Sequence, residues 1–93
     1  MVKKGRFKGT VRFMLVADGD VRKAFVAGDF TGWRPLAMQR RSGMYGLTVS
    51  LPPGRHQYKF ILGGQWVTDP DNIDRAVSDM GTINSLVVVD STI

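Results

Sequence analysis

Residues 55–70, RHQYKFILGGQWVTDP, constrain the fold of this chain more than any other segment. Two apolar-rich runs flank Gly63-Gly64, and such a glycine pair predicts a two-residue hairpin loop because both positions accept positive φ without steric cost. The loop also sets the register of the hairpin. It pairs Leu62 with Gln65, Ile61 with Trp66, Phe60 with Val67 and Lys59 with Thr68.

This register sorts the side chains of the hairpin onto two faces, because opposed residues share a face and successive residues alternate. One face is apolar and suits a core; it carries Tyr58, Phe60, Leu62 and Val67. The opposite face carries Gln57, Lys59, Ile61, Trp66 and Thr68. A mixture of an indole, a cation and an amide is unusual for a solvent face, and we expect this face to bind a ligand.

The rest of the composition favours an all-β fold with a single core. With 93 residues the chain has room for one domain, and without cysteine it must be stabilised by packing. All eight acidic residues are Asp, and 11 residues are Gly, a composition that disfavours helices and suits strands with tight turns.

Alternating apolar positions and turn signals predict about seven short strands, hence an immunoglobulin-like antiparallel β-sandwich. Residues 1–9 are expected to be a loose lead-in, and residues 10–93 a single domain. Besides the hairpin, strands are expected near residues 10–17, 22–27, 36–41, 45–51 and 83–89. Turns or loops are expected at residues 18–20, at residues 28–33, and at residues 69–82, the last crossing from one sheet to the other.

The charge of the chain is uneven. Residues 1–46 hold ten Lys/Arg and three Asp, a net +7, whereas residues 47–93 hold three Lys/Arg and five Asp, a net −2. This basic half is either a solubilising surface or a patch that binds polyanions. No run is apolar and long enough to span a bilayer or to act as a secretory signal, so we expect a cytoplasmic protein.

Enzyme chemistry is poorly provided for, and no metal or cofactor is expected. His56 is the only histidine and should be buried and hydrogen-bonded; without Cys or Glu, the usual nucleophile–base pairs and zinc sites cannot form. The Asp residues of 69–79 could pair as in a glycosidase, but Asp in turns mostly accepts from backbone amides. The segment DPDNID, residues 69–74, begins like a calcium-binding loop but does not complete one, because Ile73 stands at a ligand position and Met80 stands where a bidentate Glu is needed.

Carbohydrate binding is better provided for. A sugar ring presents an apolar face and a rim of hydroxyls, so a receptor needs an exposed aromatic plane with donors and amides beside it. Trp66 offers the plane and Lys59 a donor on the same face, while Trp33 and Asn84 could add a second plane and an amide. The alternative role for each tryptophan is core packing. The register argues against this alternative for Trp66 and leaves it open for Trp33.

The segments AFVAGDFTGW, SLPPGRHQYKF, GGQWVTDP and GTINSLVVV resemble the family 48 carbohydrate-binding modules, especially the glycogen-binding domains of AMP-activated protein kinase beta subunits. The resemblance runs in order from about Thr10 to Val89. It implies a β-sandwich that binds α-1,4-glucans such as glycogen, starch or malto-oligosaccharides without catalysis. Because such modules usually accompany a catalytic domain or regulatory subunit, it also implies a glucan-metabolising partner.

The resemblance implies six sugar-binding residues. Trp33 and Trp66 would stack on glucose, and Lys59 and Asn84 would bind hydroxyls. Thr82, in the segment Gly81–Asn84, would assist, and Met80 stands where relatives have a leucine that contacts the sugar ring.

Two other functions remain open from the sequence. A basic sandwich with exposed aromatic residues could bind single-stranded nucleic acid, although the positive charge lies in the half of the chain away from Trp66. A protein-interaction module on the same fold is the other alternative.

Overall fold

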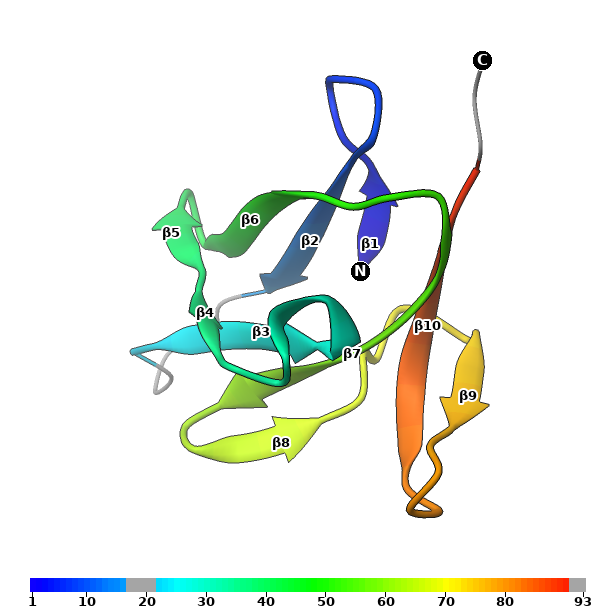
Figure 1. Ribbon diagram of the computed structural model, residues 1–93. Helices are drawn as coiled ribbons and strands as arrows, with labels where there is room; N and C mark the ends of the chain where they lie inside the picture. The colour runs from blue at the N-terminus through cyan, green and yellow to red at the C-terminus, as the bar shows by residue number, and fades with distance from the viewer. Residues whose placement is uncertain (17–21, 91–93) are drawn as a thin grey trace.

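The computed structural model describes residues 1–16 and 22–90, which form an antiparallel β-sandwich of ten strands (Figure 1). One sheet has the strand order β1 (Val2–Lys4), β2 (Thr10–Val16), β6 (Met44–Ser50), β5 (Gln39–Arg41). The other has the order β4 (Leu36–Ala37), β3 (Ala24–Gly28), β7 (Gly54–Leu62), β10 (Ile83–Val89), β9 (Arg75–Val77), and β8 (Gln65–Val67) also pairs with β7. The predicted all-β sandwich is confirmed.

The core lies between the sheets and follows the predicted alternation. On β2, Val11, Phe13 and Leu15 point inward, and on β7 Tyr58 and Phe60 are fully buried. The Phe13 ring meets the Tyr58 ring edge-on at a centroid distance of 4.8 Å. Because each such side chain contributes about 1.5–3 kcal/mol when buried, this aromatic cluster anchors β7, the strand on which the candidate site is built.

Three expectations for the chain path are wrong. The lead-in is not loose throughout, because Val2–Lys4 pairs with β2 as strand β1. Residues 36–41 form two strands in different sheets, and the chain changes sheets at the buried Met38. Residues 69–82 do not cross between sheets; they contain β9, which pairs with β10 in the sheet that also holds β8.

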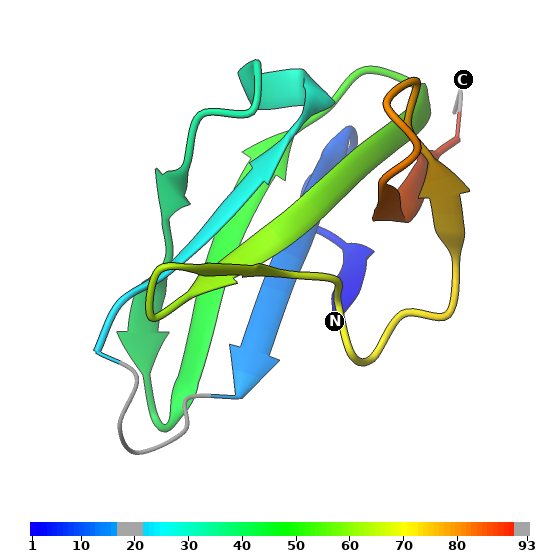
Figure 2. The same cartoon turned by 90° about the horizontal axis from the view of Figure 1, so that it is seen from below.

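The strand expected near residues 83–89 is present as β10, which lies between β7 and β9, although Val88 is exposed. Figure 2 shows β9 and β10 side by side at one edge of the molecule and the β7–β8 hairpin extending toward the opposite edge. The turn predicted at residues 18–20 lies outside the described residues. In the part of the chain that the structure describes, no helix is long and apolar enough to cross a membrane.

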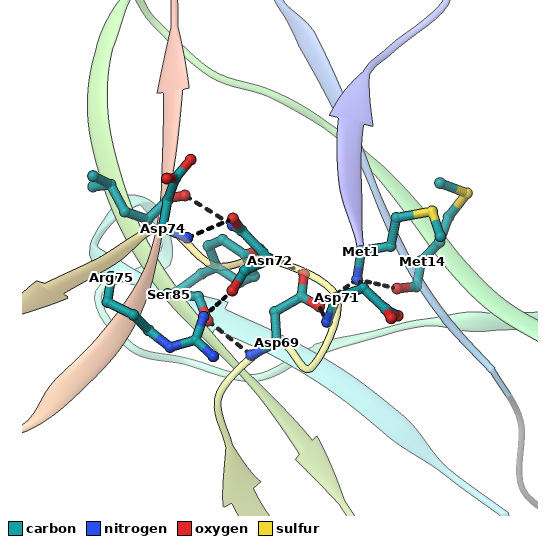
Figure 3. Close-up of polar contacts among 10 residues, drawn as sticks. Met1, Met14, Asp69, Asp71, Asn72, Asp74, Arg75 and Ser85 are labelled. Atoms are coloured by element: carbon teal, nitrogen blue, oxygen red, sulfur yellow. Dashed lines mark hydrogen bonds and ion pairs between the residues drawn. The ribbon is translucent and has the colours of Figure 1, made fainter.

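A buried carboxylate fixes the chain after β8. Asp69 is fully buried, accepts a hydrogen bond from the Tyr58 hydroxyl at 2.7 Å, and its backbone N–H donates to the Ser85 hydroxyl at 2.7 Å. Figure 3 shows this region, where Asp69 also accepts from the backbone N–H of Asp71 and from the amine of Met1. The expectation that turn Asp residues bond to backbone amides is therefore confirmed for Asp69. Burial, chiefly, raises the pKa of Tyr58 well above its usual range.

Candidate functional site

The β7–β8 hairpin presents Trp66 to solvent. Three of the four predicted pairs form: Leu62 with Gln65, Ile61 with Trp66 and Phe60 with Val67, and Gly63 and Gly64 have φ of 55° and 82°. β8 ends at Val67, so the predicted pair of Lys59 with Thr68 does not form. Trp66 is 47% exposed, whereas Ile61, opposite it on the same face, is only 6% exposed. Trp66 is therefore not a core residue, which confirms the prediction made from the alternation.

The second tryptophan is held by a shaped loop between β3 and β4. The 3-10 turn η1 (Asp29–Thr31) begins after Gly28, whose backbone N–H donates to the Thr31 hydroxyl at 3.1 Å. The Gly28 carbonyl accepts from the Trp33 N–H at 2.9 Å, and Trp33 has a left-handed φ of 63°. Because this conformation is unfavourable for a bulky side chain, the loop stores strain to place Trp33 at the surface, where it is 37% exposed.

A tight turn between β9 and β10 carries the third part of the site. The Ser78 hydroxyl lies 2.7 Å from the Thr82 hydroxyl and accepts from the backbone N–H of Thr82 at 3.2 Å. Gly81 closes the turn with φ of 82°, and its N–H donates to the Ser78 carbonyl at 2.9 Å. The turn leaves Met80 at its tip with its side chain 91% exposed.

Asn84 lies at the base of the site. It is the second residue of β10, is only 3% exposed, and its side-chain N–H donates to Gln57 Oε1 at 2.9 Å. Lys59 follows two positions after Gln57 on β7, so both share the outward face of that strand.

These segments meet around one concavity of about 470 Å³. It is lined by Trp33, Lys59, Trp66, Ser78, Asp79, Met80, Thr82 and Asn84. All six residues predicted for the site are thus brought together from four separate stretches of the chain. Ser78 and Asp79 were not predicted, although the Ser-Asp dipeptide three residues before Gly81-Thr82 is a turn signal that could have indicated them.

Other charged and titratable groups of interest lie elsewhere. His56 Nε2 lies 2.8 Å from the Pro52 carbonyl, so the predicted hydrogen bond is confirmed, but the side chain is half-buried and not buried as expected. The N-terminal cations line a different concavity, of about 420 Å³, between the β1–β2 hairpin and β10; they are Lys3, Lys4, Arg6 and Lys8. The basic charge of this segment is therefore not part of the tryptophan-lined concavity.

A concavity on a β-sandwich, lined by two exposed tryptophans and by amide and hydroxyl groups, defines the class of the carbohydrate-binding modules. Comparison with known proteins agrees with this class. Residues 11–93 match the family described as the glycogen recognition site of AMP-activated protein kinase, and the chain belongs to that family.

Relatives and solved structures extend the comparison. The chain is 34% identical to the beta-1 subunit of 5'-AMP-activated protein kinase from Rattus norvegicus over 74 residues, which are 80% of this chain and 27% of the subunit. It thus spans about a quarter of that relative. A maltogenic amylase from S. marinus shares the fold, with a TM-score of 0.82, 20% identity, and coverage of 99% of this chain and 16% of the amylase.

A third comparison involves a sugar complex. A pullulanase mutant from Paenibacillus barengoltzii, solved in complex with maltotetraose, matches with a TM-score of 0.61 and 25% identity over 92% of this chain and 14% of the enzyme. The sandwich therefore recurs as a small part of much longer chains.

Proposed function

We propose that this chain binds α-1,4-glucans such as glycogen, starch and malto-oligosaccharides through the concavity between β8, the Trp33 loop and the β9–β10 turn, without catalysing a reaction. The observation that carries the proposal is that Trp33 and Trp66 line the same concavity and are 37% and 47% exposed. Buried tryptophans would serve packing; exposed ones on a concave surface offer planes on which the apolar faces of glucose stack.

The polar groups of the concavity suit the rim of a sugar. Lys59 supplies N–H donors, and the Asn84 amide and the Thr82 hydroxyl can both donate and accept. Neighbouring hydroxyls of a glucose unit can each serve as donor and acceptor, so such groups match a neutral sugar. Membership of the glycogen-recognition family supports the same ligand class.

The partner belongs to the proposal as well. The chain matches about a quarter of a kinase regulatory subunit and a small part of two glucan-acting enzymes. We therefore expect it to act beside a glucan-metabolising enzyme or a regulatory subunit, recruiting the glucan while the partner performs the chemistry. That residues 10–93 form a single domain, and that the protein is cytoplasmic, stay predictions.

Affinity electrophoresis tests the proposal. In a native gel that contains glycogen, the unmodified protein should be retarded, and Trp66→Ala should migrate as it does without glycogen. Because Trp66 is half exposed, its removal should leave the thermal melting temperature almost unchanged. Phe7→Ala is the matched control, since Phe7 is an aromatic residue that is 69% exposed and lies outside the concavity. Equal retardation of Trp66→Ala and the unmodified protein would overturn the site.

A further inference from the structure

Gln57 does not line the concavity, but it is hydrogen-bonded to two segments that carry site residues: the turn before Trp33 and strand β10 with Asn84. Its side-chain Oε1 accepts from the Asn84 amide at 2.9 Å. Its backbone N–H donates to Asp29 Oδ2 at 3.0 Å. Asp29 begins η1, the turn that leads to Trp33. Gln57 is thus hydrogen-bonded both to the turn that leads to Trp33 and to Asn84 on β10.

The hydrogen bond to Asn84 fixes the orientation of the Asn84 amide, which decides whether its oxygen or its N–H₂ group faces a bound sugar. An asparagine amide has an acceptor oxygen and an N–H₂ group of nearly the same shape, so its orientation is set only by hydrogen-bond partners. Asn84 is 3% exposed and presents only a small part of its side chain to the concavity. When Gln57 Oε1 accepts from one Asn84 N–H, the carbonyl oxygen and the second N–H remain for a ligand.

The strand register explains why Gln57 can do this. Gln57 pairs with Leu86 across β7 and β10, and Asn84 precedes Leu86 by two positions, so Asn84 and Gln57 are diagonal neighbours on one face. A glutamine is long enough to span this diagonal separation. In the described residues, every buried side-chain N or O atom has a hydrogen-bond partner, so this pair completes the polar groups at the base of the site.

The contact with Asp29 adds a second constraint. Gly28 lies in the same region, and a Cβ built on it would lie 2.5 Å from the Gln57 carbonyl oxygen. The backbone of the Trp33 loop and that of β7 at Gln57 are therefore in close contact. A shift of β7 at Gln57 would therefore move the start of the Trp33 loop and would also displace the acceptor of the Asn84 amide.

We propose that Gln57 is a positioning residue for glucan binding, which holds the Asn84 amide in the orientation that offers its oxygen and one N–H to the sugar. This inference rests on the proposed function and deepens it. It assigns to Gln57 a role in affinity for the hydroxyl rim, whereas the tryptophans supply stacking to the ring.

Two substitutions separate positioning from packing. Gln57→Met keeps the length of the side chain but removes the acceptor, so the Asn84 amide loses its partner. Gln57→Glu keeps an acceptor and cannot donate, so it supports only the Asn84 orientation described above. The binding of maltoheptaose would be measured by calorimetric titration for each variant, alone and combined with Asn84→Ala, with a thermal melt of every variant to establish folding.

The expected result is a weakening of about three- to ten-fold for Gln57→Met, the range of one hydrogen bond, and recovery to within about two-fold of the unmodified protein for Gln57→Glu. In the Asn84→Ala background, Gln57→Met should change affinity by less than about two-fold, because the group that it positions is already absent. Equal losses from Gln57→Met with and without Asn84, or full affinity of Gln57→Met, would overturn the inference.

Trp66→Ala, titrated beside these variants, distinguishes the two levels of the account. If Trp66→Ala loses binding but Gln57→Met does not, the positioning role is wrong and the glucan site stands. If Trp66→Ala binds as the unmodified protein does, the glucan site is wrong and the role of Gln57 falls with it.

Discussion

Trp33 and Trp66 line the same concavity although one follows a 3-10 turn after β3 and the other lies on β8. The two residues are far apart in the sequence, so no local pattern places them together. The six-stranded sheet brings them together, because β3 and β8 flank β7 on opposite sides. The site therefore depends on correct pairing of β7 with both neighbours.

The exposed tip of the β9–β10 turn gives a first prediction. Met80→Ala should weaken maltoheptaose binding about five-fold, the effect of removing about 1 kcal/mol of apolar contact, without lowering the melting temperature. Calorimetric titration measures the affinity. Ile73→Ala is the matched control: Met80 and Ile73 are 91% and 92% exposed, but only Met80 lines the concavity. Equal affinities for Met80→Ala and Ile73→Ala would remove Met80 from the site.

The strained backbone of Trp33 gives a second prediction. Trp33→Gly should abolish retardation on a glycogen gel while the melting temperature stays the same or rises, because glycine adopts the φ of 63° at no steric cost. Trp33→Ala should also lose retardation but retain the strain, and so should melt at a lower temperature than Trp33→Gly. Retardation of Trp33→Gly comparable to that of the unmodified protein would show that only Trp66 stacks.

The separation of the basic segment from the tryptophans gives a third prediction. Glucan binding should change by less than about two-fold between about 50 and about 200 mM salt, since the ligand is neutral, whereas phosphate contacts would weaken steeply over that range. A variant with Lys3, Lys4 and Lys8 changed to Gln should bind maltoheptaose unchanged. Steep salt dependence of the Trp66-dependent binding would favour the nucleic-acid alternative.

The buried Tyr58–Asp69 pair gives a fourth prediction, on stability. Its raised pKa keeps Tyr58 neutral in the folded protein, while in the unfolded chain the phenol ionises near pH 10. Below that pH, Tyr58 is neutral in both states and its contribution to the free energy of unfolding is fully present. Above it the unfolded state binds fewer protons, so the free energy of unfolding should fall with pH by about 1.4 kcal/mol per unit for this group. Urea titrations above pH 10 should show a shallower fall in Tyr58→Phe; an identical slope would contradict the assignment.

The sequence predicted the hairpin well because its register is a local property. Gly63-Gly64 fixes the loop, and period-two alternation then places Trp66 and Lys59 on one face. The same local reasoning missed that Ile61 on that face is buried; Ile61 pairs with Phe25 of β3, which is distant in sequence.

The path of the chain outside regular alternation was harder to predict. The strand β9 has only three residues, too few for a period to emerge, and β1 holds two lysines in three residues. The six site residues came from combining the alternation with a family resemblance. Gln57 was placed on the correct face, but its bond to Asn84 depends on the diagonal register of β7 and β10, which no local pattern encodes.

The most direct test of the central claim is a titration of the intact protein with maltoheptaose, followed by tryptophan fluorescence. Trp33 and Trp66 are the only tryptophans in the chain, and both line the concavity. Stacking of a glucose ring would exclude water from both indoles, so we predict a fluorescence change that saturates with sugar and is reduced in Trp33→Gly and in Trp66→Ala. No change at millimolar maltoheptaose would contradict the account.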